Sequence, residues 1–513
     1  MVNTSHALNI AVVALYLLAM LAFGAWGRKR TQNQADYLVA GRRLGPFLYM
    51  GTMAAVVLGG ASTVGGVGLG YRMGLSGMWL VVAIGVGVLL LSLCFSGMIS
   101  RLRIYTVSDM LALRYGPRAT RASGIVMLLY TVALAVTSTG AYATVLHVLL
   151  GWDRWLCVLL GGAVVLVYSV VGGMWSITLA DQAQFFIKTI GIFFLMLPIV
   201  LSQAGGFAGV RERLGDEAFR LVGTAEHGAD AGTILTWFLV YTLGLLIGQD
   251  IWQRVFTARS PRVATFGGAA AGVYCILYGA AGALIGMGAK AVLGDGIVAR
   301  DDVYAEVANR LLPAGLGGFV LAAGIAAMMS TASGALIAAA TVAKNDVVPL
   351  VTGRASLSES TAEGGSAEAH DEISGNRAWV LGLGLLVTAI SALMALSSGG
   401  GDVVVACLTV AYDLLVGGLL VAIVGGFVWK RGTGAGATAA MIGGMLATVA
   451  AMAAYAVKLG SALDGILANE PIYWGLGVSL ALYVIVSLLT PVTAEPIRAE
   501  WRARLSRSHS ATR

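Results

Sequence analysis

Apolar stretches long enough to cross a lipid bilayer recur along this chain and constrain its fold more than any other feature. Of the 513 residues, 58% are hydrophobic and only 12% are charged, which is too little polar surface to coat a water-soluble domain of this size. An α-helix satisfies its own backbone hydrogen bonds in lipid, so we predict an all-α polytopic membrane protein with about 13 transmembrane helices. The predicted spans lie near residues 8–26, 44–67, 77–99, 121–150, 155–173, 181–203, 233–254, 264–290, 315–343, 378–397, 402–429, 435–457 and 471–491.

The distribution of basic residues predicts the orientation of the chain. No Lys or Arg precedes the first span, whereas Arg28, Lys29 and Arg30 follow it. Because cytoplasmic loops are enriched in Lys and Arg, we expect an extracellular amino terminus and a cytoplasmic carboxyl terminus in the cell membrane. The same bias explains the net charge of +7, so no nucleic-acid partner is expected. The basic tail 495–513 is expected either to lie on anionic membrane lipid or to stay disordered.

An adjacent pair of hydroxyl residues, Ser330 and Thr331, lies near the middle of an apolar segment at 322–343. Hydrocarbon cannot accept hydrogen bonds, so these hydroxyls must face protein, water or an ion. Small residues surround the pair and allow another backbone to approach. This chemistry suits a cage of neutral oxygens for a small, hard cation.

Glycines cluster in the second and seventh predicted spans, at Gly59-Gly60 and Gly65-Gly66 in the second and at Gly244 and Gly248 in the seventh. Each glycine weakens a helix by about 1 kcal/mol relative to alanine. The clusters therefore predict two interrupted helices, as in transporters built from inverted repeats. Close packing of unbroken helices through small residues is the alternative interpretation.

Four stretches of the chain together resemble the sodium:solute symporter family. They are the loop that begins DYLVAGR at Asp36, GGMWSITLADQAQFF at 172–186, GQDIWQRVFTARSP at 248–261 and AAMMSTASGALIAAATVAKND at 326–346. The resemblance implies a LeuT-type core of two inverted five-helix repeats with broken second and seventh spans. It also implies a secondary active transporter rather than an enzyme, with no organic cofactor and no obligatory protein partner.

The resemblance places the principal sodium site of the family between the second and ninth spans. Its matching positions are the backbone carbonyls of Ala55, Leu58 and Ala327 and the hydroxyls of Ser330 and Thr331. The alternative is that both hydroxyls bond back to carbonyls of their own helix. Asp181 matches an acidic position implied to attract or relay the ion, although its sequence context also fits a helix start.

The same resemblance places the solute beside the two broken spans and the eleventh span. The candidate contacts are Ser62, Thr63, Tyr241, Gly244 and Thr409. Because these positions lack the amides and carboxylate of the family's sugar carriers, we favour a small organic acid, an amino acid or a related nitrogen compound.

Asp413 lies inside the eleventh span, where a carboxylate is costly and suggests function. It could bind a substrate ammonium, carry a proton or pair with Lys188. At the inner end of the seventh span, Asp250 and Arg254 could form a salt bridge that acts as a gate, or both side chains could be solvated.

These observations predict sodium-coupled import of a small organic solute by alternating access. Proton coupling through Asp181 or Asp413, or a sensor that retains the transporter fold, remains an alternative. The predicted organisation is a first helix and loop at 1–43, inverted repeats at 44–203 and 233–429, an extracellular loop at 204–232, a cytoplasmic linker at 344–377, two peripheral helices at 430–494 and the tail at 495–513.

Overall fold

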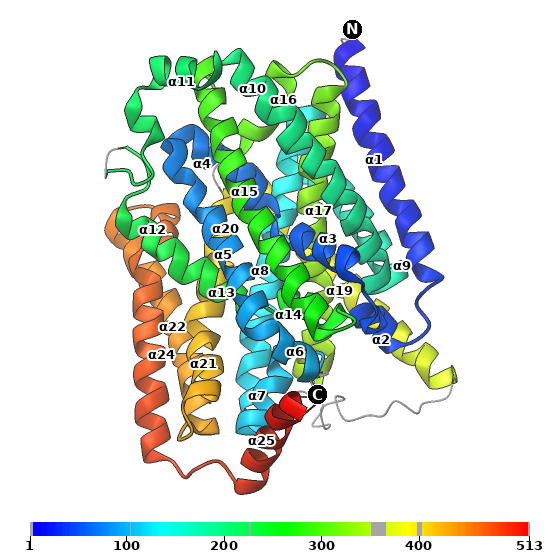
Figure 1. Ribbon diagram of the computed structural model, residues 1–513, viewed down its shortest axis with the longest axis vertical. Coiled ribbons are helices and arrows are strands. Elements are labelled where there is room, and N and C mark those ends of the chain that lie inside the picture. The colour runs from blue at the N-terminus through cyan, green and yellow to red at the C-terminus, as the bar shows by residue number, and fades with distance from the viewer. Residues whose placement is uncertain (1–3, 103, 225–226, 350–365, 398–402, 511–513) are drawn as a thin grey trace.

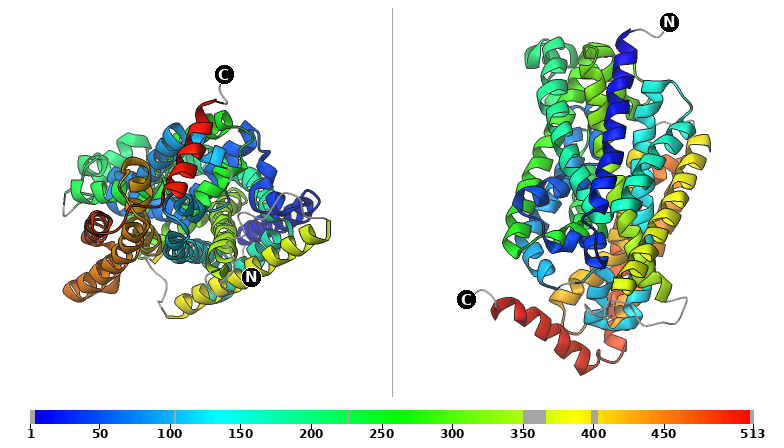
Figure 2. Two further views of the ribbon diagram at one scale, coloured as in Figure 1. Left: turned by 90° about the horizontal axis from the view of Figure 1, so that it is seen from below. Right: turned by 90° about the vertical axis from the view of Figure 1, so that its right-hand side faces the viewer.

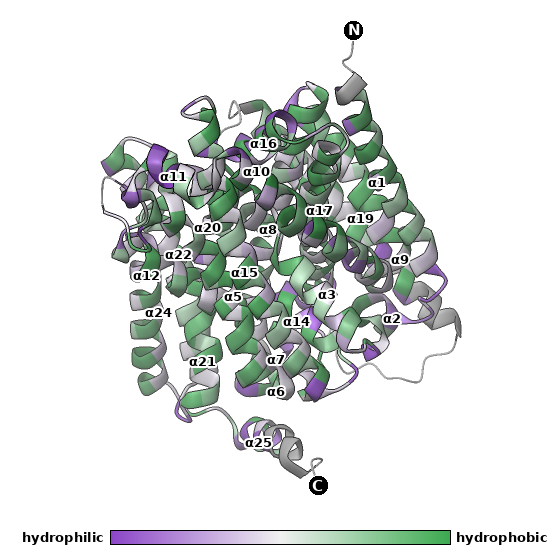
Figure 3. Ribbon diagram, turned by 45° about the horizontal axis from the view of Figure 1, so that its top comes forward, coloured by the Kyte–Doolittle hydropathy of each residue, from purple (hydrophilic) through white to green (hydrophobic). Residues whose placement is uncertain are grey.

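The chain forms a tall bundle of helices in the computed structural model, which describes residues 4–102, 104–224, 227–349, 366–397 and 403–510 (Figure 1). Within these ranges the only β-pairing is an isolated bridge between Leu44 and Ala258. Apolar residues follow the lengths of the long helices, and polar residues gather toward the two ends of the bundle (Figure 3). This distribution suits a protein surrounded by lipid along its sides.

The helices run in the following order: α1 Thr4–Arg28, α2 Gln34–Val39, α3 Pro46–Val57, α4 Gly66–Met73, α5 Trp79–Leu90, α6 Ser96–Leu102, α7 Val107–Tyr115, α8 Pro117–Leu150, α9 Arg154–Thr189, α10 Leu197–Gln203, α11 Gly206–Leu214, α12 Ala231–Trp237, α13 Leu243–Leu245, α14 Gln249–Thr257, α15 Pro261–Leu293, α16 Val303–Leu311, α17 Leu316–Val342, α19 Ser366–Ser397, α20 Val403–Leu415, α21 Val421–Val428, α22 Gly434–Leu459, α23 Ala462–Leu467, α24 Glu470–Leu489 and α25 Glu495–Ser510. Short π-helical segments join several of them, as at Ala61–Gly65 and Phe238–Thr242.

Ten helical stretches of the described chain are long and apolar enough to cross a membrane, and one bent pair makes eleven. Two of the ten fold back on themselves, Ala61–Ser100 at Gly74 (φ 64°) and Arg154–Gln203 at Gly173 (φ 57°). Past Gly173 the chain returns along α1, because Gln184 donates a 3.0 Å hydrogen bond to the hydroxyl of Tyr16. The described residues thus give ten or eleven candidate spans against the predicted number of about 13, and these two stretches, of 40 and 50 residues, are longer than the roughly 20 residues of one crossing.

Both predicted interruptions are present. Helix α3 ends at Val57, Leu58 leaves the helical region (φ −90°, ψ 76°), and helical structure resumes at Ala61. The second interruption separates Ala231–Leu245 from Gln249–Thr257, and the two parts are bent by 45°. We call these the first break and the second break.

Helix α17 is the central element of the bundle, and every residue from Val320 to Val342 is buried. Helices α1, α22 and α24 lie at the periphery (Figure 1). Helix α25 crosses one end of the bundle beside the carboxyl terminus (Figure 2), and Trp501 on it packs against Phe427. The predicted tail is thus helical up to Ser510, the last described residue.

The predicted cytoplasmic linker 344–377 is helical in both of its described ends. Its middle part, 350–365, lies outside the described residues, and the chain is helical again from Ser366 onward. The segment 366–377 extends the following apolar helix, since its alternating charged and small residues are compatible with helix.

Candidate functional site

The hydroxyl pair of α17 faces the first break. Ser330 Oγ lies 2.7 Å from the carbonyl oxygens of both Ala55 and Ala327, and Thr331 Oγ1 donates to the carbonyl of Val56 at 2.6 Å. Intact helix would have engaged the Ala55 and Val56 carbonyls with amides one turn later. The break frees these carbonyls, and α17 approaches them closely because position 59 is glycine: a Cβ there would lie 2.4 Å from Thr331 Oγ1.

Lys188 of α9 reaches one of these carbonyls, that of Ala55, and the neighbouring carbonyl of Ala54. Its ammonium donates to Ala54 O at 3.0 Å and to Ala55 O at 3.3 Å, and the side chain is fully buried. The suggested pairing of Lys188 with Asp413 is therefore wrong. Lysine reaches the break because its long stem spans the gap between α9 and α3, whereas Asp413 lies on α20.

Asp181 forms a fully buried ion pair with Arg254 of α14, with Nη2 and Oδ2 3.1 Å apart. The same oxygen accepts a hydrogen bond from Thr52 of α3. Two expectations are corrected here. Asp181 does not start a helix, since helix resumes directly after Gly173, and Arg254 pairs with Asp181 rather than Asp250. The ion pair connects α9 to α14, which follows the second break, and the Thr52 hydrogen bond connects the same carboxylate to α3, which precedes the first break.

A small central pocket lies beside the first break and contains Thr331 and Gly59 in its wall. Its other polar lining residues are Ser62, Thr137, Ser138, Asp250 and Tyr412. The Asp250 carboxylate is buried and accepts a 2.9 Å hydrogen bond from Tyr130. Among the described residues that line this pocket, none carries a basic side chain.

The remaining candidate solute residues do not form one surface. Ser62 lines the central pocket, whereas Thr63 turns away and bonds to Tyr278 at 2.9 Å. Tyr241 and Thr409 bond to each other at 3.0 Å, and neither lines the pocket. Gly244 lies against the ring of Tyr412, and the ring of Tyr241 lies 5.4 Å from it, so Gly244 and Tyr241 both pack on Tyr412.

A family model described as the sodium:solute symporter family matches residues 37–444. The chain belongs to this family. The symporter is 26% identical over 367 residues to the human high affinity choline transporter 1, an alignment that covers 66% of this chain and 62% of that protein. It is also 26% identical to the high-affinity proline transporter PutP of Bacillus subtilis, over 62% of this chain and 69% of the relative. The alignment thus spans less than two thirds of the human choline transporter.

Two solved structures share the fold of this symporter. A Na+-coupled sialic acid symporter in a substrate-bound, outward-open state superimposes with a TM-score of 0.74 at 16% identity, covering 95% of this chain and 99% of the other. The nucleobase-cation-symport-1 family transporter Mhp1 superimposes with a TM-score of 0.51 at 14% identity, covering 92% and 98%. These likenesses confirm the predicted LeuT-type fold. The chain is thus a multi-pass membrane protein that belongs to a family of transporters.

Three residues that the fold brings to this region of the symporter were not predicted to lie there: Lys188, Asp250 and Tyr412. The sequence analysis considered Lys188 and Asp250 with other partners, because a charged residue within a membrane span is costly, and it had no signal for Tyr412. The sequence did not show which neighbours they meet. Asp413, which the sequence did single out, is buried with Oδ1 unbonded and lies outside the central pocket.

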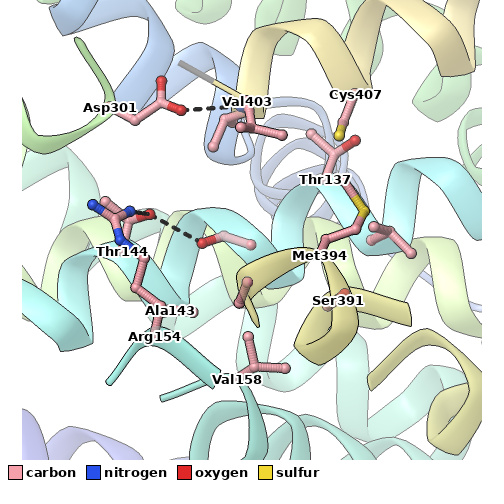
Figure 4. Close-up of a pocket in the computed structure, with 14 residues that line it drawn as sticks. Thr137, Ala143, Thr144, Arg154, Val158, Asp301, Ser391, Met394, Val403 and Cys407 are labelled. Atoms are coloured by element: carbon pink, nitrogen blue, oxygen red, sulfur yellow. Dashed lines mark hydrogen bonds between the residues drawn. The ribbon is translucent and has the colours of Figure 1, made fainter. Parts of the chain in front are cut away.

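A second pocket lies between α8, α9, α19 and α20 (Figure 4). Its polar rim includes Arg154, which donates to Thr144 at 2.9 Å, and Asp301, which accepts from the amide of Val404 at 3.0 Å. Thr137 lines both this pocket and the central one, so the two are adjacent.

Proposed function

We propose that this symporter imports a small organic solute by alternating access and couples that import to sodium bound at the first break. The observation that carries the proposal is the pair of α17 hydroxyls against the carbonyls freed by the break. The proposed sodium ligands are the carbonyls of Ala55, Leu58 and Ala327 and the hydroxyls of Ser330 and Thr331. Neutral oxygens suit a monovalent cation that must be released in every cycle.

The central pocket is the proposed solute site. Sodium bound beside Thr331 would order the wall of this pocket and so raise its affinity for solute, and the solute would raise the affinity for sodium equally. Ser62, Asp250 and Tyr412 would contact the solute. Tyr241, Gly244 and Thr409 would position Tyr412, and Thr63 would hold the segment Ala61–Gly65 against α15. The pocket at Arg154 and Asp301 offers an approach to this site.

The charge of the central pocket narrows the solute class. A buried carboxylate with no basic side chain in the same wall favours a cationic or zwitterionic partner over a simple organic acid. We therefore propose an amino acid or a related compound that bears an ammonium group. The printed functions of the choline and proline transporters among the relatives are consistent with this class.

Proton coupling is a second candidate, and one observation favours it. Asp413 is buried and its Oδ1 has no hydrogen-bond partner, as suits a carboxyl group that holds a proton. Asp181 suits this role less well, because Arg254 already balances its charge. In both candidates the predicted repeats 44–203 and 233–429 would move against each other, with the amino terminus outside the cell membrane.

Uptake into proteoliposomes tests the solute class and the coupling ion together. The probes are radiolabelled choline and proline, lactate as a carboxylate-only solute and glucose as an uncharged solute, each under an inward gradient of sodium or of potassium. We expect sodium to drive uptake of an ammonium-bearing probe. Uptake that does not depend on sodium and follows an imposed pH gradient would show that protons are the coupling ion.

The Asp250→Asn variant tests whether the Asp250 carboxylate binds the ammonium group of the solute. Loss of a charged partner in a buried site should raise the KM for the ammonium-bearing solute by about tenfold or more, corresponding to about 1.4 kcal/mol. Asp295→Asn is a matched control, because Asp295 is an exposed carboxylate that pairs with Lys290 near the end of α15. An unchanged KM in Asp250→Asn would remove the argument for an ammonium group.

A further inference from the structure

The inference concerns Lys188, which places a positive charge at the proposed sodium site. Its ammonium lies 3.3 Å from Ala55 O, the same oxygen that lies 2.7 Å from Ser330 Oγ. The side chain is fully buried and reaches the break from α9, whereas Ser330 reaches it from α17. The carbonyl oxygen of Ala55 therefore contacts both a hydroxyl of the proposed sodium site and the ammonium of Lys188.

The partners of Lys188 differ from those of the other buried cation nearby. Arg254 is balanced by the carboxylate of Asp181, 3.1 Å away. The hydrogen bonds of Lys188 within the described residues go instead to two neutral carbonyls, Ala54 O and Ala55 O. Backbone carbonyl dipoles stabilise this buried monovalent charge. An alkali cation bound at the first break would need the same kind of stabilisation. Lys188 therefore uses the stabilisation that sodium would use.

We propose that the Lys188 ammonium and the coupling sodium are mutually exclusive occupants of the Ala55 carbonyl. The lysine acts as a tethered cation that competes with sodium and lowers its affinity for the first break. Two unit charges about 4 Å apart in a poorly solvated site repel each other strongly, so both cannot share one carbonyl. Sodium then binds only when the ammonium withdraws. This inference rests on the proposed placement of sodium at the first break.

A purely structural role for Lys188 makes a different prediction. If the lysine only ties α9 to α3, its removal should loosen the protein without favouring sodium. If it competes with sodium, its removal should improve sodium binding, and sodium should restore stability that the variant loses. The direction of the change in sodium affinity separates the two roles.

The test is sodium binding to the purified full-length symporter, measured by calorimetry and by thermal unfolding as NaCl replaces KCl at constant ionic strength. We expect Lys188→Met to lower the half-saturating sodium concentration by about tenfold or more, within the range of about 5–150-fold that is typical of coupled sites. Lys188→Arg, which keeps the charge, should not tighten sodium binding. Lys290→Met is a matched control, because Lys290 pairs with Asp295 near the far end of α15.

The possible results distinguish the inference from the proposed function. Equal sodium affinity in the wild type and Lys188→Met would overturn the competition and leave sodium coupling intact. Sodium binding that appears only in Lys188→Met would support the competition and remove sodium as the coupling ion of the wild type. Sodium binding in neither protein would overturn both. If Lys188→Met fails to fold, Lys188→Gln removes the charge while keeping a hydrogen-bond donor, and the same comparisons apply.

Discussion

The two breaks of this symporter satisfy their backbone groups in opposite ways. At the first break, the carbonyls of Ala55 and Val56 bond to hydroxyls on α17, 275 residues away in the chain. At the second break, the carbonyl of Gly244 accepts from the amides of Ile247 and Gly248, both at 3.0 Å. The carbonyl of Leu246 accepts from the indole nitrogen of Trp252 at 2.8 Å, six residues away.

This difference suggests that the two breaks have different roles. Polar groups that are satisfied locally form a rigid corner, which holds Asp250 at the start of α14 beside the central pocket. Polar groups satisfied by distant helices depend on how those helices pack, so they can exchange a protein partner for an ion. This contrast is the reason why the proposed sodium site lies at the first break and not at the second.

The largest expected effect comes from the Asp181–Arg254 ion pair, which links α9 to the helix that follows the second break. Arg254→Met should destabilise the protein by about 3–5 kcal/mol, because it leaves the Asp181 carboxylate buried without a counter-charge. Thermal unfolding in detergent measures the loss. Adding Asp181→Asn to Arg254→Met should recover much of it, and a double variant no more stable than Arg254→Met would show that the charge itself is not the cause.

The hydroxyl pair of the first break should give the next largest effect. Ser330→Ala with Thr331→Ala should weaken sodium binding by about 100-fold, since each lost oxygen ligand is expected to contribute about tenfold, or 1.4 kcal/mol. Sodium titration followed by calorimetry measures the change. Thr388→Ala is the control, because that hydroxyl bonds to Gly384 of its own helix. An unchanged sodium affinity in the double variant would show that the two breaks do not differ in the proposed way.

The second break should give the smallest effect. Trp252→Phe removes the indole donor from Leu246 O and should lower the free energy of unfolding by about 1 kcal/mol, as expected for one hydrogen bond. Sodium affinity should stay within error of the wild type, because the lost contact is local. A large loss of sodium binding in Trp252→Phe would mean that the two breaks are coupled more tightly than their separate contacts indicate.

The sequence predicted the broken helices and the polar residues of this site better than it predicted which residues contact one another. The glycine clusters located both breaks, since glycine weakens a helix wherever it occurs. The adjacent hydroxyls in an apolar span correctly indicated that Ser330 and Thr331 face polar partners, because lipid offers none. The partner of Asp181 was not predictable, because Arg254 follows the second break and reaches α9 only through the packing of α14.

By itself, the sequence determined that this chain spans a membrane many times, that two of its helices are interrupted and which family it resembles. Hydropathy and backbone propensity are local properties, and each can be read within about 20 residues. Only the tertiary structure decided that Lys188 meets the carbonyls of the first break and that Asp250 lines the central pocket. Those contacts join residues more than 100 positions apart, so they depend on the direction in which each packed helix turns its side chains.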